Sequence, residues 1–141
     1  MTEVIDIPLQ DMVSRLGADK ASEVIASKRA AMARIEGFVR ELNLSCDFRY
    51  LPGFLYTERE GEESWLRQEW EAARKIGMDA HHEPEPPLPF KTRSAIRFNR
   101  QARFHPLHYL SGLVREAERR GCRIHEETLI VLQAVRRACN R

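Results

Sequence analysis

Apolar side chains recur with a helical period in the first third of the chain. The repeat has spacings of three, four and seven residues and consists of Ile25, Met32, Ile35, Val39 and Leu42. Such a stripe predicts a long amphipathic helix over residues 20–42. A shorter helix is predicted over residues 9–16, and Gly17 separates the two. Asn43 follows the long helix, where a residue that tolerates left-handed backbone commonly stands.

After the long helix, the apolar residues no longer recur with a helical period but at every second position. Residues 46–50 alternate in polarity, and residues 53–57 are rich in aromatic and β-branched types. Pro52-Gly53 is a strong turn signal, so two short paired strands are predicted on either side of it. Residues 94–98 alternate in the same way and predict a third strand of the same sheet.

Two further helices have recognisable ends. The first is predicted over residues 64–76, with Ser64 as its cap and Gly77 after its last turn. The second is predicted over residues 106–120, because Pro106 suits the first helical position. The apolar stripe of this second helix consists of Leu107, Leu110, Leu113, Val114 and Ala117. We expect this stripe to lie in the core, so that shortening Leu110 would be costly.

Three stretches have less regular patterns. Residues 79–89 contain four of the seven prolines, which predicts an irregular surface crossover. Residues 122–125 predict a short strand. Residues 126–141 fit either a strand as far as Leu132 or a helix, and the strand is favoured.

Together these elements predict the α+β class, with a small mixed or antiparallel sheet and long helices packed on one face. The length of 141 residues fits a single domain that spans residues 1–141. A chain of this length can bury a sizeable core without disulfide bonds or a structural metal.

Charge is distributed unevenly along the chain. Residues 1–90 carry 11 basic and 17 acidic side chains, a net of −6, whereas residues 91–141 carry 12 and 4, a net of +8. The whole chain therefore has a net charge of +2. A basic segment can face nucleic acid, an acidic neighbour or a phosphate-bearing cofactor, and most often it is simply a solvated face.

The sequence also suggests a compartment. The N-terminal residues are acidic without a hydrophobic signal region, and no stretch approaches the roughly 18 apolar residues of a membrane span. Cys46, Cys122 and Cys139 are widely spaced and odd in number, which favours reduced thiols. We therefore expect a cytoplasmic protein with no membrane partner.

Recognisable catalytic motifs are missing from the sequence. It contains no glycine-rich dinucleotide loop, Walker lysine loop, nucleophile elbow or zinc-protease motif. His81, His82 and Glu83 are metal-capable types, but adjacent residues point apart and no fourth ligand is suitably spaced, so no metal is expected.

Two runs of sequence carry a more specific signal. The first, at residues 41–56, is Glu-Leu-Asn-Leu-Ser-Cys-Asp-Phe-Arg-Tyr-Leu-Pro-Gly-Phe-Leu-Tyr. The second, at residues 95–113, is Ala-Ile-Arg-Phe-Asn-Arg-Gln-Ala-Arg-Phe-His-Pro-Leu-His-Tyr-Leu-Ser-Gly-Leu, and Gly-Cys-Arg-Ile-His-Glu-Glu-Thr follows at residues 121–128. In order and spacing these runs resemble the FAD-dependent amine and amino-acid oxidoreductases of the D-amino-acid oxidase superfamily. The resemblance covers roughly residues 10–130.

The resemblance implies a two-part enzyme, in which a Rossmann-like domain binds FAD and a mixed sheet closes over the flavin as a substrate lid. This chain resembles the lid and the start of the return into the FAD-binding domain. It lacks the family's glycine-rich strand and loop, the acidic residue that follows them, and the C-terminal third. A pyrophosphate needs a helix N-terminus with glycine backbone close by. FAD is thus the cofactor that the resemblance implies, but we expect this substrate-domain fragment to hold none alone.

The resemblance also places five side chains near the substrate cavity: Tyr56, Arg97, Gln101, Phe104 and His105. Tyr56 and Arg97 lie on strands that flank the substrate in the family, although either could equally be surface or core. The other three match a turn that faces the flavin cavity, although His105 could simply begin the helix. We expect no catalytic residue in this chain.

Two further residues correspond to the family's cofactor-binding side. Ile130 resembles the position whose backbone lies beside the adenine of FAD, and Val131 is its neighbour. The alternative, in which Ile130 is only a buried sheet residue, is favoured for an isolated fragment.

Two functions are consistent with these patterns. The one we favour is a substrate-domain fragment or subunit of an FAD-dependent amine or amino-acid oxidoreductase, inactive alone, in whose complete form the flavin takes hydride from the carbon bearing the amine. Its partners would be an FAD-binding domain or subunit, a small amine or amino-acid substrate, and a second copy bound through the apolar faces at Phe98, Phe104 and residues 129–132. The alternative is a non-catalytic interaction module that binds nucleic acid through the basic segment. Its arginines are scattered and match no recognised reading motif, which argues against this alternative.

Overall fold

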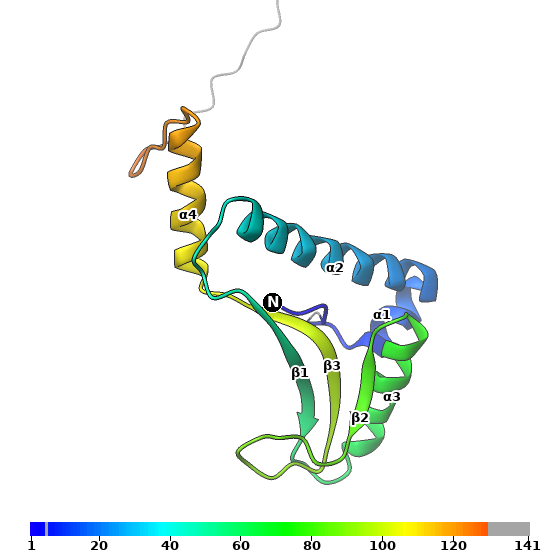
Figure 1. The fold of residues 1–141 in the computed structure, drawn as a ribbon. Helices are drawn as coiled ribbons and strands as arrows, with labels where there is room; N and C mark the ends of the chain where they lie inside the picture. Colours follow the sequence, from blue (N-terminus) through cyan, green and yellow to red (C-terminus); the bar gives the residue numbers. More distant parts are fainter. Residues whose placement is uncertain (5, 130–141) are drawn as a thin grey trace, which may run out of the picture.

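A computed structural model describes residues 1–4 and 6–129 of the chain. In chain order its helices and strands are α1 (Leu9–Leu16), α2 (Ala18–Glu41), β1 (Arg49–Thr57), α3 (Glu63–Lys75), β2 (Ala80–Glu83), β3 (Ser94–Arg103) and α4 (Pro106–Arg119). The strands form one antiparallel sheet in the order β1-β3-β2 (Figure 1). The predicted α+β class is therefore confirmed.

β1 is one continuous strand, so the prediction of two strands joined by a Pro-Gly turn is wrong. Both halves pair with β3, from Arg49 opposite Arg103 to Thr57 opposite Ser94, and the register shifts between Leu51 and Gly53. β1 is an edge strand of the described sheet, where a proline without an N–H group is tolerated, particularly at a bulge. On β3 the extra residues of the bulge include Arg100, whose φ of 54° is left-handed.

The predicted irregular crossover at residues 79–89 is wrong at its start. Residues 80–83 form β2, which pairs antiparallel with β3 from Ala80 opposite Phe98 to Glu83 opposite Ala95. The strand ends where the prolines begin, at Pro84. Pairing with a strand more than ten residues away decides this structure, and local composition does not reveal it.

The helices α1, α2 and α3 cover one face of the sheet. α3 packs on all three strands, α1 packs on α3, and α2 packs on α1 (Figure 1). Leu66 of α3 and Ile96 of β3 are fully buried between these layers, and Leu9 and Ile25 join them from α1 and α2. These three helices lie on one face, as predicted, whereas α4 does not.

A buried carboxylate holds α1 on α3. Glu69 of α3 accepts hydrogen bonds from the backbone N–H groups of Leu9 (2.7 Å) and Gln10 (3.1 Å), and its side chain is almost completely buried. The residue at the N-cap of α1 is Pro8, which supplies no side-chain cap. Glu69 thus satisfies two N–H groups that α1 itself leaves unpaired and places a negative charge at the positive end of the helix dipole.

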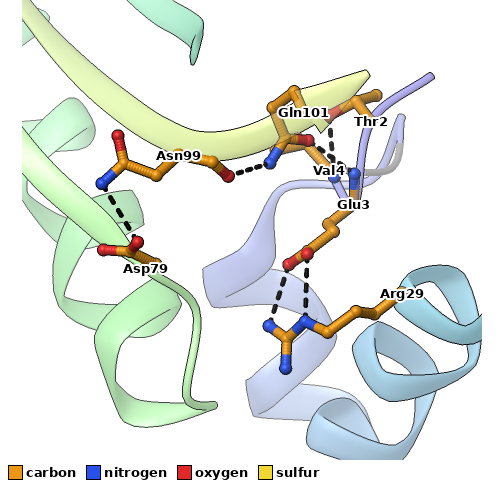
Figure 2. A network of polar contacts seen from close by, with 7 residues as sticks. All are labelled: Thr2, Glu3, Val4, Arg29, Asp79, Asn99 and Gln101. Carbon is orange, nitrogen blue, oxygen red and sulfur yellow. Dashed lines mark hydrogen bonds and ion pairs between the residues drawn. The ribbon is translucent and has the colours of Figure 1, made fainter. Parts of the chain in front are cut away.

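The N-terminal segment connects β3 to α2. Gln101 accepts a hydrogen bond from the backbone N–H of Glu3 (2.8 Å), and both carboxylate oxygens of Glu3 accept from Arg29 of α2 at 3.0 Å (Figure 2). The Glu3 side chain is buried, and its hydrogen bonds raise the pKa of the Arg29 guanidinium. Residue 1 extends this contact, since its backbone exchanges hydrogen bonds with Ala102.

The predicted helix ends are confirmed at three places and wrong at one. The short helix Leu9–Leu16 is present as predicted, Asn43 is left-handed with φ 49°, and Pro106 is the first residue of α4. Ser64 is not the cap of α3, because the helix begins at Glu63 and the N-cap position is Glu62.

α4 projects away from the sheet, so the prediction that its apolar stripe lies in the core is wrong (Figure 1). Leu107 and Leu110 are 67% and 54% exposed, and Val114 is also exposed. The buried residues of α4 are Tyr109 and Gly112. An amphipathic stripe shows that a helix face suits an apolar neighbour, but it does not say that the neighbour belongs to the same core.

The described C-terminal segment contains no further strand. Residues 122–125 are irregular, contrary to the prediction, and no described strand pairs with them. The predictions for residues 130–141 lie outside the described residues. No helix within residues 1–4 and 6–129 is long and apolar enough to cross a membrane.

Replacing Glu69 tests the capping contact. Glu69→Ala leaves two backbone N–H groups without an acceptor, so we expect the free energy of unfolding to fall by about 2–4 kcal/mol. The exposed Glu71→Ala on the same helix is the control and should change stability by no more than about 0.5 kcal/mol. Urea unfolding of both variants gives the comparison, and equal losses would contradict a special role for Glu69.

The burial of leucines on α3 and α4 gives a second prediction. Leu66→Ala should cost about 2–5 kcal/mol, because it removes a buried side chain and leaves a cavity. Leu110→Ala should stay within about 0.5 kcal/mol of the parent chain, because Leu110 faces solvent. A large loss for Leu110→Ala in urea unfolding would place α4 in the core after all.

Candidate functional site

The register of the strands separates the sheet into two faces, because residues opposite each other on paired strands share a face. The covered face carries two rows of partners: Gly53, Phe98 and Ala80, and then Leu55, Ile96 and His82. The opposite face also carries two rows: Phe54, Arg97 and His81, and then Tyr56, Ala95 and Glu83. No described helix packs on this opposite face, which we call the open face.

Arg97 lies at the centre of the open face, on the central strand. Its Nε is 3.6 Å from Oε2 of Glu83, too far for a hydrogen bond. Among the described residues, this Nε is the buried side-chain polar atom that has no hydrogen-bond partner. The side chain as a whole is 39% exposed, so the rest of the guanidinium group reaches solvent.

Aromatic side chains lie on the β1 side of Arg97. Phe54 is its partner in the register, and Tyr56 is on the next row. Phe90, from the connection between β2 and β3, packs against Tyr56 with ring centroids 5.1 Å apart. Tyr56 and Phe90 remain 39% and 43% exposed, so they form an apolar surface that no described segment covers.

Acidic groups lie on the β2 side of Arg97. Glu83 is one, and Asp79, just before β2, is the other. The pKa of the Asp79 carboxyl group is lowered, chiefly by hydrogen bonds from Asn99 and His81 and further by the charge of Arg97. The open face is therefore apolar toward β1, cationic at its centre and anionic toward β2.

The structure brings together two of the five predicted cavity residues, Tyr56 and Arg97. Gln101 lies on the covered side, where its carbonyl oxygen accepts from Glu3 and its amide nitrogen donates to the carbonyl of Asn99. Its polar atoms thus serve the contact between β3 and the N-terminal segment. Ile130 and Val131, the predicted cofactor contacts, lie outside the described residues.

Phe104 and His105 lie where β3 leads into α4. Phe104 packs edge-on against Tyr109 at 5.2 Å, beside the buried Cys46, whose carbonyl accepts from the backbone N–H of His105 (2.7 Å). His105 occupies the N-cap position, and its Nδ1 accepts from the backbone N–H of His108. His105 therefore caps the start of α4, in line with the interpretation that it stands at the helix start.

Sequence reasoning missed four side chains of the open face: Phe54, His81, Glu83 and Phe90. The alternation in residues 54–57 could have placed Phe54 beside Tyr56. The positions of His81 and Glu83 depend on the long-range pairing of β2, and that of Phe90 depends on the path of a proline-rich connection, so no local pattern predicts them.

Several arginines of the described part of the basic segment pair with carboxylates. Arg93 pairs with Glu60, Arg103 pairs with Asp47, and both Arg119 and Arg120 pair with Glu116. These two arginines lower the pKa of the Glu116 carboxyl group to about 2. Such pairing does not favour the nucleic-acid alternative. Within the described residues no group of three or more His, Cys, Asp or Glu side chains is placed to hold a metal ion.

Comparison with known proteins gives two matches. A family model described as "FAD dependent oxidoreductase" matches residues 12–138. The protein named "Putative Rieske 2Fe-2S iron-sulfur protein YhfW", from Bacillus subtilis (strain 168), is 29% identical over 124 residues, which are 88% of this chain and 24% of that protein. The chain thus spans about a quarter of the length of this relative. No solved structure matches the chain.

Proposed function

The chain belongs to the family of FAD-dependent oxidoreductases, and from this premise we propose that it is the substrate-facing lid of an enzyme that oxidises a small amine or amino acid. The observation that carries the proposal is the open face, where Tyr56 and Arg97 lie on adjacent rows of a sheet whose other face is covered by helices. A sheet backed by packed helices holds its side chains rigidly, as a binding surface requires.

The described residues do not fit FAD itself. At the N-terminus of α1 the carboxylate of Glu69 already accepts from the backbone N–H groups, and at that of α4 the side chain of His105 does so. The N-terminus of α3 carries two acidic residues, Glu62 and Glu63. α2 begins after Gly17, but the carboxylate of Asp19 in its first turn would repel a phosphate. We therefore assign the binding of FAD to another part of the complete protein or to a separate subunit.

In this proposal the open face closes over the substrate, and its aromatic side chains exclude water from it. Tyr56 and Phe90 offer a contiguous apolar surface for this purpose. Removing water strengthens the electrostatic interactions that orient a bound molecule. The residues of this chain thus bind and orient, and the redox chemistry belongs to the flavin.

α4 supplies the surface that would dock on the FAD-binding part. Leu107, Leu110 and Val114 are exposed on one helix, and Ile124 is exposed just beyond it. Exposed apolar groups of this kind commonly mark a contact with another chain or domain. When the chain is alone, we propose that copies associate through this surface. Phe98 takes no part, contrary to the sequence-based expectation, because it is buried in the core.

The Bacillus relative is named an iron–sulfur protein, which suggests an electron acceptor. We propose a 2Fe-2S centre in the complete protein as that acceptor, in line with the name of the relative. A Rieske centre needs two Cys and two His ligands, and the described residues bring no such group together. We therefore place this centre elsewhere in the complete protein.

Reconstitution tests the proposed function. The chain would be produced together with a flavin-binding family member from which the matching segment has been deleted. We expect the pair to bind FAD and the chain alone to bind none, as measured by flavin absorption. We also expect an amine or amino acid to bleach the flavin anaerobically at least tenfold faster with the chain than without it, because the lid positions the substrate.

Leu110→Glu is the informative variant of this experiment. It adds a charge to the exposed stripe of α4 without touching the core, so it should prevent assembly while the chain remains folded. The matched control is Leu16→Glu, at the exposed end of α1, which should assemble normally. Assembly that tolerates Leu110→Glu but not Leu16→Glu would contradict the proposed docking surface.

A further inference from the structure

We propose that a cavity between α3 and β2 binds a flat, uncharged molecule that carries a carbonyl oxygen or a similar hydrogen-bond acceptor, and that His82 recognises this acceptor. This α3–β2 cavity lies on the covered side of the sheet, away from the open face. The proposed function makes no use of it, so binding here is independent of that function.

The walls of the α3–β2 cavity come from three elements of the fold. The cavity has a volume of about 330 Å³ and is lined by Glu63, Arg67 and Trp70 of α3, His82 of β2 and Ser94 of β3. α3 packs on both of these strands, so regular elements hold the lining side chains in place. A cavity of this volume can accommodate a molecule built on a single ring.

A hydrogen-bonded pair of side chains supplies the polar group of the cavity. Nε2 of His82 lies 3.0 Å from Oγ of Ser94, which is a buried residue. The Ser94 hydroxyl makes no other hydrogen bond to a described residue, and a buried donor without an acceptor is costly, so its hydrogen goes to Nε2. The neutral imidazole ring then carries its own hydrogen on Nδ1. This Nδ1–H donates to no described residue, so it can donate to an acceptor on a ligand.

Trp70 supplies the apolar wall of the cavity. Its Nε1–H donates to the carbonyl oxygen of Ala80 at 3.2 Å, so the indole ring reaches from α3 to β2 and its single polar atom already has a partner. The rest of the ring is carbon surface, on which a flat ring packs favourably. The body of the ligand is therefore flat and apolar.

The two charged residues of the cavity favour an uncharged ligand. Glu63 accepts a hydrogen bond from the backbone N–H of Gly61 at 2.8 Å, and Arg67 pairs with Glu71 at 3.3 Å. Each charge therefore already has a partner, and the two charges have opposite signs. An ionic ligand would leave water without gaining an unpaired counter-charge, which is unfavourable.

Two other cavities are poorer candidates. A cavity of about 310 Å³ beside Gly53 is lined by apolar residues apart from Thr2, so it offers little to orient a ligand. A cavity of about 290 Å³ beside Gly112 is lined by Glu116 and Arg119, which already bind each other through two hydrogen bonds. The α3–β2 cavity differs from both because it joins an apolar wall to a donor that no described residue uses.

Nuclear magnetic resonance titration of the chain with acetophenone, an uncharged aromatic ketone, tests the proposal. We expect acetophenone to shift the indole N–H signal of Trp70 and the amide signals of His82 and Ser94 in a saturable way. Benzoate and benzylamine, which carry a charge, should bind more weakly than acetophenone. The chemical shifts of the ring nitrogens, measured on the neutral ring of His82, should show the hydrogen on Nδ1.

A variant and a matched control show whether His82 reads the carbonyl group. α-Methylstyrene has the shape of acetophenone with a methylene group in place of the oxygen. In the double variant His82→Phe, Ser94→Ala, which keeps a ring and leaves no hydroxyl unpaired, the affinity for acetophenone relative to α-methylstyrene should fall about fivefold, as expected for one net hydrogen bond. His81→Phe should leave this ratio unchanged, because His81 lies beside His82 on β2 but on the open face. Amide spectra show whether each variant is folded.

Several results would overturn the proposal. A ratio that stays the same in the folded double variant would show that His82 does not recognise the carbonyl group. In the parent chain, absence of saturable binding, shifts near Gly53 without a shift of Trp70, tighter binding of a charged probe, or a ring hydrogen on Nε2 of His82 would each contradict it. None of these results bears on whether the chain assembles with an FAD-binding part, so the two proposals fail separately.

Discussion

The carboxylate of Glu69 is the contact on which the layered arrangement depends. It joins α3, which lies on the sheet, to the first backbone N–H groups of α1, and α1 is the helix on which α2 packs. A helix N-terminus buried without acceptors would be unstable, and Pro8 provides none. The second connection, through Gln101, Glu3 and Arg29, ties the middle of α2 to β3 of the sheet. In both connections the carboxylate is buried, so its hydrogen bonds specify where the helices lie.

Because all three helices of this layer lie on one side, the sheet keeps an open face. That face is not a uniform apolar surface, since aromatic groups, a central arginine and acidic groups follow one another across the strands. α4 leaves the sheet altogether and exposes its own apolar stripe. A chain with two surfaces of different character that no described segment covers suits a role as one part of a larger enzyme. The family to which it belongs and the greater length of its Bacillus relative are consistent with that role.

The predictions from sequence were most successful where local chemistry decides the structure. The period of the apolar residues located the helices, and Pro106 fixed the start of α4. They failed where the local structure depends on pairing with a segment that is distant in the sequence. Pro52 signals a turn by itself, but β3 holds it in an edge strand, and the short β2 exists through pairing with β3. Of the candidate site, Tyr56 and Arg97 were identified through a family resemblance, whereas Glu83 and Phe90 could not be, because their positions depend on that same pairing.

The central claim is that the open face and the stripe of α4 are the surfaces by which this chain completes an enzyme. Hydroxyl-radical footprinting of the chain, alone and assembled with an FAD-binding part, measures the accessibility of each side chain. The account predicts that Tyr56, Phe90 and Leu110 become protected on assembly, while Ile7 and Leu16, which are also exposed, react as before. Protection of Ile7 and Leu16, with Tyr56 and Leu110 unchanged, would contradict it.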